Sequence, residues 1–454
     1  MTDSTKSIPF RASAAKAVRD RGLRAALQHA TGVFTVKRAD AFAGADLELW
    51  RNEASEIRVQ VLSRLEDYLG RFTANATSAG AQIHRARDAA AAHDIIGSIL
   101  RDHGIERVVK AKSMVSEEIH LNDYLSRIGI TPVETDLGEY IIQIAGEHPS
   151  HIIVPAIHKD RRQVGTLFSE KLGCTYSEDP EALCKVAKHI LREEFLSAKA
   201  GMSGANFMVA DSGSIVLFSN EGNIRMCTTL PPLHIAVTSM EKIIPSLSDL
   251  PKFVRLLPRS ATGQVLTSYM SVITGTRKPG EATGAQELHI VIVDNGRSLI
   301  VNSEYREMLK CIRCGACLNA CPVYRTVGGH AYGSTYPGPM GIVYTALLEG
   351  MEKAHPLLDA TTLCGACGDV CPVRVPLPAL LRRLREERVE RGLTPPSERF
   401  GMAAFGVAAK SPSLFQYGQR AAGLFWPLAV KMAGKEVLDR MPVPADRTFR
   451  GRMS

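Results

Sequence analysis

Seven cysteines lie close together in the last third of the sequence, in two runs that share a pattern. The first run has the spacing C-x2-C-x2-C-x3-C-P, and the second has C-x2-C-x3-C-P. The first spacing is that of bacterial ferredoxins, in which three thiolates on a tight loop hold one iron–sulfur cluster and the fourth reaches another. The seven residues are Cys311, Cys314, Cys317 and Cys321 in the first run, and Cys364, Cys367 and Cys371 in the second.

In this ferredoxin pattern the last cysteine of each run binds the cluster of the other run, which assigns ligands to two clusters. Cluster 1 takes Cys311, Cys314, Cys317 and Cys371, and cluster 2 takes Cys321, Cys364 and Cys367. The full pattern would place a fourth cysteine for cluster 2 at position 361, which is Thr361. Cluster 2 is therefore either a 3Fe–4S cluster or a 4Fe–4S cluster whose last ligand is Thr361, Thr362, water or a partner group.

Zinc is the main alternative interpretation of these cysteines. A structural zinc ion is held by two C-x2-C pairs, so the third evenly spaced cysteine of the first run would be superfluous. A second alternative is that iron–sulfur clusters only stabilise the fold, but two adjacent clusters suit the relay of single electrons better. We expect Arg313, Arg325 and Arg374 to raise the potential of the anionic clusters, unless they are ordinary surface side chains.

The rest of the chain must position these cysteines, and its composition is that of a globular protein. The chain has 454 residues, 45% hydrophobic and 22% charged, with a formal net charge of +8. This excludes a disordered or collagenous chain, and the charge is too small to indicate nucleic-acid binding. Short apolar runs alternate with amphipathic stretches, which predicts an α/β domain with a largely parallel sheet. We expect strands at 107–109, 151–154, 214–218, 234–237 and 289–293, and helices at 11–29, 115–127, 180–195, 341–353 and 377–391.

These patterns divide the chain into four parts. A helical segment at 1–60 is followed by an α/β domain at 61–300, a helix-and-loop domain with the cysteine runs at 301–393, and a basic, partly helical region at 394–454. No run reaches the ~18 consecutive apolar residues of a transmembrane helix, and no secretory leader follows Met1. We expect a cytoplasmic protein, with peripheral contact to the inner membrane face as an option.

Polar residues at the ends of apolar runs are the candidate ligand-binding residues of the α/β domain. Open α/β sheets bind ligands outside the carboxyl ends of their strands. Asp211, Glu221 and Asn223 are placed to line such a crevice, although the same residues also suit turns. Lys110 and Lys112 could hold an anion, but a solvated lysine pair is the simpler interpretation.

Other catalytic patterns are absent from the sequence. There is no G-x-G-x-x-G fingerprint for a dinucleotide, and neither H-E-x-x-H nor G-x-S-x-G occurs. His148, His151 and His158 lack regular ligand spacing, so we expect ordinary surface or core histidines. The sequence names no catalytic residue, and two-electron chemistry would need a separate subunit or cofactor.

The chain resembles the iron–sulfur B subunit of the bacterial lactate-utilisation system over nearly its whole length. Besides the cysteine runs, the resemblance rests on residues 110–118 (KAKSMVSEE), 205–214, 220–230, 294–297 (DNGR) and 328–339 (GGHAYGSTYPGP). It implies a lactate-utilisation domain, similar in fold to the sugar-phosphate isomerase and CoA-transferase group, followed by an α-helical ferredoxin-type domain. It also implies two 4Fe–4S clusters, the second with three cysteine ligands, so that Thr361 is a family trait.

The resemblance further implies a function. Members of this family act with subunits A and C in oxidising L-lactate to pyruvate. We therefore expect a non-catalytic or partly catalytic subunit that relays single electrons through two clusters to an acceptor such as a quinone or cytochrome. Two alternatives remain open: the α/β domain is itself an enzyme or redox sensor for a small anionic metabolite, or the clusters are structural and the protein is an assembly scaffold.

Overall fold

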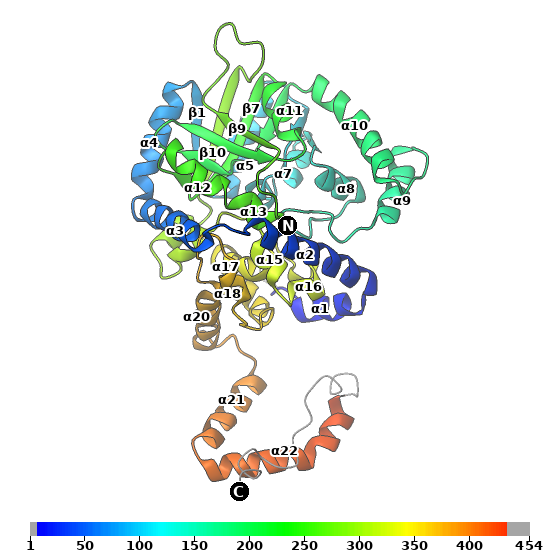
Figure 1. Cartoon of the computed structure of the whole chain (residues 1–454), viewed down its shortest axis with the longest axis vertical. Helices are drawn as coiled ribbons and strands as arrows, with labels where there is room; N and C mark the ends of the chain where they lie inside the picture. The colour runs from blue at the N-terminus through cyan, green and yellow to red at the C-terminus, as the bar shows by residue number, and fades with distance from the viewer. Residues whose placement is uncertain (1–6, 434–454) are drawn as a thin grey trace. The chain divides into compact units, whose positions relative to one another are not determined.

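The structure is a computed structural model that describes residues 7–433 (Figure 1). By their internal contacts the residues form two units, Met1–Arg385 and Glu386–Ser454. The expected segments 1–60 and 61–300, and most of 301–393, fall within the first unit. The α/β part and all seven clustered cysteines therefore belong to one unit.

A six-stranded sheet forms the centre of the first unit. Its strands are β1 (Ala81–Ala86), β2 (Arg107–Lys110), β3 (Thr131–Glu134), β4 (Ala200–Ser203), β7 (Leu233–Ser239) and β10 (Glu287–Val293). Their order is β1-β10-β7-β4-β2-β3, and every neighbouring pair is parallel. All residues of β7 are buried, as parallel strands covered on both faces require. The predicted parallel α/β sheet is thus confirmed.

Helices cover both faces of this sheet. On one face lie α5 (Ala89–Asp102), α6 (Met114–Glu118) and α7 (Leu121–Arg127). On the other lie α8 (Leu137–Ala145), α10 (Pro180–Ser197) and α11 (Asn223–Thr229), with α9 (Arg161–Leu172) packed beside α8 and α10 (Figure 1). Val108 packs into the first layer and Val109 into the second, because successive strand residues point to opposite faces.

A second, smaller sheet has four strands that the sequence only partly indicated. They are β5 (Phe207–Val209), β6 (Ser214–Ser219), β8 (Ile243–Ile244) and β9 (Tyr269–Ile273), in the order β8-β5-β6-β9. β5 and β8 are parallel, and the other pairs are antiparallel. The short helices α12 (Leu250–Val254) and α13 (Leu257–Ala261) follow β8.

Four expected elements differ from the structure. The helix expected at 11–29 is interrupted at Asp20, and the one expected at 341–353 is interrupted at Gly350. Residues 151–154 form bends and not a strand, because the His151 ring nitrogen Nδ1 accepts the backbone N–H groups of Ile153 (3.0 Å) and Val154 (3.1 Å). The predicted helix at 115–127 is two helices, α6 and α7. His120 between them has a left-handed φ of 50°, which interrupts the helix.

Four helices precede the large sheet. They are α1 (Phe10–Arg19), α2 (Arg21–Ala41), α3 (Leu47–Ser63) and α4 (Leu65–Ser78). Aspartates cap two of them: Asp20 accepts a hydrogen bond from the backbone of Leu23, and Asp46 from that of Leu49. These helices do not pack only among themselves. In the cysteine-containing segment, α2 contacts α15 (Ala316–Ala320) and α16 (Tyr324–Val327), and α3 contacts the 3-10 helix η2 (Arg306–Lys310).

The cysteine-containing segment consists of short helices joined by loops. Its helices are α14 (Arg297–Val301), the 3-10 helix η2 (Arg306–Lys310), α15 (Ala316–Ala320), α16 (Tyr324–Val327), α17 (Gly338–Glu349), α18 (Met351–Ala354), α19 (Ala366–Asp369) and α20 (Leu377–Glu390). Between residues 301 and 393, all of which are described, there is no strand.

The second unit contains two helices, α21 (Pro396–Ala409) and α22 (Pro412–Ala433). They contact each other, with the rings of Phe405 and Phe415 6.4 Å apart. Several large apolar side chains on them are exposed, among them Phe400 (77%) and Leu424 (78%). Of the expected basic region at 394–454, residues 434–454 lie outside the described part. Among the helices of residues 7–433, none is long and apolar enough to cross a membrane.

Candidate functional site

Four of the seven cysteines meet around the start of α15. Cys311 directly follows η2, Cys314 and Cys317 flank Gly315, and Cys371 comes from the second run, just after α19. All four line one small cavity. Gly315 has a left-handed φ of 76°, and a side chain there would press against Ile153 at 3.1 Å. The glycine lets the loop turn tightly while it lies against residues 151–153.

The surroundings of these four sulfur atoms suit thiolate ligands. Burial, reinforced by the neighbouring thiolate of Cys371, raises the pKa of Cys311 to about 11. Backbone N–H groups point at sulfur: that of Arg313 lies 3.4 Å from Cys311 Sγ, and that of Val375 lies 3.2 Å from Cys371 Sγ. Buried thiols that repel one another as anions, yet receive N–H donors, fit a site in which iron replaces the thiol protons.

The other three cysteines, Cys321, Cys364 and Cys367, form a second group that opens to solvent. Burial raises the pKa of Cys367 to about 12, and the neighbouring thiolates of Cys321 and Cys364 add to the rise. Cys364 is exposed, and its pKa is lowered by the backbone N–H of Ala366 and the side chain of Thr362. Thr361 is half-buried, and its hydroxyl accepts the backbone N–H of Leu363 at 3.1 Å.

A buried tyrosine lies between the two groups of thiols. The Tyr332 hydroxyl is buried and has no hydrogen-bond partner among residues 7–433. Burial, together with the thiolates of Cys321 and Cys317, raises its pKa. A buried hydroxyl without an acceptor costs free energy, and an anionic cluster in either group would offer one. In residues 7–433, no three His, Cys, Asp or Glu side chains converge on a point that could hold a single metal ion.

Cations that the sequence did not single out surround the first group. Arg51, on α3, donates to the carbonyl oxygens of Cys371 (2.9 Å) and Gly368 (3.1 Å). The charge of Arg38, on α2, acts on Cys314 and Cys371. Of the three arginines that the sequence named, Arg313 is buried, Arg325 is half-buried and Arg374 pairs with Glu48. The missed cations lie some 300 residues before their contacts, so no local pattern could have indicated them.

A chain of buried charges joins the cysteine loop to the α/β domain. Arg313 Nη2 lies 2.8 Å from Glu241 Oε1, and the Nε atom of Arg297 lies 2.9 Å from Glu241 Oε2. Arg297 also pairs with Glu118 at 2.6 Å, and the Tyr336 hydroxyl donates to the same carboxylate at 2.6 Å. Burial raises the pKa of Glu241, but the charges of Arg297 and Arg313 outweigh burial and lower it to about 2. Three segments that carried the resemblance thus meet in one network.

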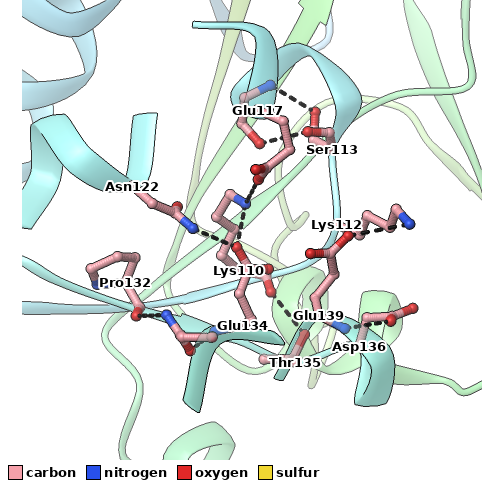
Figure 2. A network of polar contacts seen from close by, with 12 residues as sticks. Lys110, Lys112, Ser113, Glu117, Asn122, Pro132, Glu134, Thr135, Asp136 and Glu139 are labelled. Atoms are coloured by element: carbon pink, nitrogen blue, oxygen red, sulfur yellow. Dashed lines mark hydrogen bonds and ion pairs between the residues drawn. The ribbon is translucent and has the colours of Figure 1, made fainter. Parts of the chain in front are cut away.

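A second network lies at the carboxyl ends of β2 and β3 (Figure 2). The ammonium of Lys110 lies between Glu134 (2.5 Å) and Glu117 (3.1 Å), and its side chain is 1% exposed. The expected solvated lysine pair is therefore wrong for Lys110, because carboxylates and not water surround it. Lys112 Nζ lies 3.2 Å from Glu139 Oε1, but the two do not form a well-aligned hydrogen bond. Figure 2 shows the two side chains next to each other.

A cavity of about 390 Å³ opens beside this network. It is lined by loops that follow β2, β3 and β4, which is where open parallel sheets place ligands. Glu221 and Asn223 line it, as the sequence indicated, but Asp211 does not and is exposed. Two residues of the cysteine loop, Ile312 and Arg313, line both this cavity and the one between the thiols.

Two groups that line this cavity, Glu221 and Lys242, and one that pairs with the lining residue Lys112, Glu139, have pKa values close to neutrality. Burial raises the pKa of Glu221 to about 7, and the neighbouring Asp136 adds to the rise. Burial likewise raises the pKa of Glu139 to about 7. For Lys242, burial and the charge of Arg313 lower the pKa to about 7. Shifted pKa values in a cavity are typical of functional sites.

The three histidines do not share a site. His151 is buried and its ring lies 3.1 Å from the side-chain oxygen of Asn319. Its pKa is lowered to about 3, by burial first and by the charge of Lys112 second. His158 contacts Glu147 at 2.8 Å, while the carbonyl oxygen of His148 lies 2.7 Å from the ring of His330. Core and surface roles, as expected, account for these contacts.

Comparison with known proteins assigns the family. Residues 69–293 match the LUD domain, and residues 307–375 match the 4Fe-4S dicluster domain. Lactate utilization protein B of Shouchella clausii is 44% identical over 454 aligned residues, which cover 97% of this chain and 96% of that protein. The protein of the same name in Bacillus subtilis is 47% identical and covers 82% of this chain and 78% of its own length. The chain belongs to the lactate utilization protein B family.

Membership of the lactate utilization protein B family confirms the resemblance seen in the sequence. The LUD domain contains the parallel sheet, and the dicluster domain contains all seven clustered cysteines. A relative in Escherichia coli, named an uncharacterized electron transport protein, is 46% identical and covers 82% of this chain and 79% of its own. A solved DUF162 family protein from Deinococcus radiodurans aligns with 52% of this chain and 98% of its own, at 14% identity and a TM-score of 0.26.

Proposed function

We propose that this chain is the iron–sulfur electron-transfer subunit of a complex that oxidises L-lactate to pyruvate. The observation that carries the proposal is the gathering of seven thiols into two groups that lie side by side. In this assignment Cys311, Cys314, Cys317 and Cys371 hold cluster 1, and Cys321, Cys364 and Cys367 hold cluster 2 within an α-helical ferredoxin-type domain. Bound there, two 4Fe–4S clusters would supply one-electron transfer. The names of the relatives support lactate as the substrate of the complex.

The two cysteine sites differ in burial and in neighbouring charge. This difference supports a relay in which the second site, and not the first, exchanges electrons with a partner protein. The thiols of the first site are buried or half-buried beside the α/β domain, and Arg51 and Arg38 offset their negative charge. The second site has an exposed cysteine, Cys364, and a half-buried threonine in place of a fourth one. We infer that the second site faces the partner protein with which electrons are exchanged, and that its fourth iron takes Thr361, Thr362, water or a partner group.

The partners follow from the stoichiometry of the reaction. Oxidation of lactate to pyruvate releases two electrons and two protons, whereas each cluster carries one electron. A group that accepts the electron pair is therefore required, and we place it on subunits A and C of the complex. The final acceptor would be a quinone or a cytochrome.

The proposal is tested by adding L-lactate to the cluster-loaded protein under anaerobic conditions. We expect the visible absorption of the clusters to bleach in the presence of subunits A and C and to remain unchanged in their absence. Bleaching by lactate without partners would contradict the proposal. Clusters that resist reduction even by dithionite would contradict it as well, and would indicate a scaffold.

A second candidate function is supported by the cavity beside Lys112. An α/β domain that binds a small anionic metabolite could itself be an enzyme or a redox sensor. Three titratable groups with pKa values near 7 favour this alternative. It predicts that lactate or a related acid bleaches the clusters in the isolated chain, which is the result that the first proposal excludes.

We also propose a peripheral location at an anionic membrane for the second unit. Its helices α21 and α22 expose large apolar side chains, including Phe400, Phe425 and Leu428. The sequence from 394 to 454 carries nine basic and four acidic residues. Exposed aromatic and aliphatic side chains together with excess positive charge are typical of segments that lie on anionic lipid surfaces.

A further inference from the structure

We propose that the cavity beside β2, β3 and β4 binds the carboxylate of a small organic acid between the ammonium groups of Lys112 and Lys242. The second candidate function above gives this cavity only a small anion, without naming the groups that hold it. The inference deepens the proposed function, because it places a 2-hydroxy acid of the lactate class next to cluster 1. Only the choice of a lactate-like acid as the ligand rests on the proposed function.

The position and the size of the cavity suit a small molecule. Its volume of about 390 Å³ lies at the lower end of the range for small-molecule sites, about 300–1,000 Å³. Lys112 follows β2, Asp136 follows β3 and Gly204 follows β4, each by one or two residues. The cavity is therefore outside the carboxyl ends of three adjacent parallel strands, where α/β sheets bind ligands.

Lys242 is a basic group at the cavity, and because burial and the charge of Arg313 lower its pKa to about 7, it is protonated only in part near neutral pH. Its Nζ atom donates one hydrogen bond, to the carbonyl oxygen of Ala205 at 3.0 Å. Among the side chains of residues 7–433, no carboxylate forms an ion pair with it. An ammonium has three N–H donors, so two remain for a ligand. The cost of burying this ammonium unpaired lowers its pKa, and a bound carboxylate would favour the protonated form.

Lys112 provides the second cation. Its side chain is 15% exposed, and its Nζ atom is buried without a hydrogen-bond partner, although Glu139 lies 3.2 Å away. Burial raises the pKa of Glu139 to about 7, so near neutral pH this carboxyl is ionised only in part. Glu139 therefore does not fully neutralise Lys112. Lys112, Lys242 and Asn206 all line this one cavity.

The other lining residues match the rest of a 2-hydroxy acid. Glu221, whose pKa is raised to about 7, can share a hydrogen bond with a hydroxyl group whether or not it is ionised. Ile152, Val154 and Leu217 give the cavity apolar surface for a short alkyl group. Carboxylate, hydroxyl and methyl thus each have a counterpart in the lining.

The proposed ligand site shares a wall with the cavity between the thiols of cluster 1. Ile312 and Arg313 line both cavities, so one loop separates the proposed ligand from the sulfur atoms of cluster 1. Arg313 does not neutralise the ligand, because it is already paired with Glu241 and stacked over Tyr336 and Tyr344, each at 4.8 Å. Lys112 and Lys242 are left to bind the anion.

The test is isothermal titration calorimetry with L-lactate on the full-length, cluster-loaded protein, oxidised and free of partners. We expect saturable binding by the wild type and at least ten-fold weaker binding by Lys112→Gln and by Lys242→Gln. The matched control is Lys185→Gln, which changes an exposed lysine on α10 and should bind like the wild type. Unchanged cluster absorption verifies that each variant is folded.

A second variant covers the case in which a lysine variant loses its clusters. Asn206→Asp adds a negative charge to the cavity lining while preserving side-chain shape, and it should weaken lactate binding at least ten-fold. The inference is overturned if the wild type does not bind lactate, if Asn206→Asp and the lysine variants bind as tightly as the wild type, or if inorganic phosphate binds more tightly than lactate. Failure of the proposed function gives a different result. In that case lactate would still bind, but it would not bleach the clusters when the partners are present.

Discussion

The seven clustered cysteines differ most in their access to solvent. Cys314, Cys317 and Cys371 are buried, whereas Cys364 is exposed. Burial raises the pKa of the first three, so these thiols hold their protons until iron displaces them. Cys364 is closer to the thiolate form, because the N–H of Ala366 stabilises the anion. Of the two sites, the second is thus the one that is open to solvent.

The crossed assignment of ligands predicts opposite effects for two cysteines. Cys321→Ser should remove cluster 2 and leave the electron paramagnetic resonance signal of cluster 1 intact, because Cys321 faces Cys364 and Cys367. Cys371→Ser should do the reverse. Cys184→Ser, an exposed cysteine outside both groups, is the control and should retain both signals. Loss of cluster 1 from the Cys321 variant would show that each run holds its own cluster.

At the scale of elements, the helices before the sheet fasten the cysteine loop to the α/β domain. Arg58 on α3 is fully buried and donates to the carbonyl oxygens of Glu241 (2.5 Å), Ile243 (2.8 Å) and Leu309 (2.7 Å). Leu309 precedes Cys311 by two residues. The position of the first thiol thus depends on a helix that begins 264 residues earlier in the chain, at Leu47.

Glu241 is the carboxylate on which two buried arginines depend. Glu241→Gln removes the negative charge that Arg297 and Arg313 share. Removing one partner of a buried ion pair lowers the free energy of unfolding by about 3–5 kcal/mol. We expect the apparent Tm to fall on the order of 5–10 °C in a thermal melt. Because the pKa of Glu241 is lowered to about 2, its contribution is present at neutral pH and is lost only as the pH falls toward that value.

A surface carboxylate is the control for this effect. Glu181→Gln removes the exposed partner of Lys185 on α10 and should change the apparent Tm much less, since exposed ion pairs contribute little. Equal shifts for both variants would mean that the Glu241 network does not hold the cysteine loop in place.

Elements with long apolar runs could be predicted from the sequence, and others could not. β7 and β10 were expected because each is a run of buried, mostly branched residues. β4 was missed because it reads Ala-Gly-Met-Ser, and Gly201 must be small where the carbonyl oxygen of Cys227 would lie 1.9 Å from an added side chain. The false strand at 151–154 has an apolar run, but its backbone bonds to His151 and not to a neighbouring strand.

Some residues of the candidate site could also be predicted from the sequence, and others could not. Spacing alone pointed to the seven cysteines, because their chemistry depends on local sequence. The partners Arg58, Glu241 and Arg297 carry no local pattern, and only the packing of distant elements brings them together. Lys112 was read as solvated, because the sequence could not show that the end of β2 is covered by other loops.

At the scale of the whole molecule, the two units should be separable in function. A chain that lacks residues 394–454 should keep its cluster absorption, because all seven cysteines lie in the first unit. It should no longer float with vesicles that contain phosphatidylglycerol, whereas the full chain should. Neutral phosphatidylcholine vesicles are the control, and the full chain should bind them weakly. Equal flotation of both chains would contradict the proposed membrane contact.

Everything proposed for the whole molecule depends on which metal the clustered cysteines bind. The decisive measurement is the iron and acid-labile sulfide content of protein purified without oxygen. We expect about seven to eight iron atoms and about eight sulfides per chain, the lower iron value applying if the site with Thr361 holds a 3Fe–4S cluster. Zinc without sulfide, or no metal at all in a folded protein, would contradict this expectation.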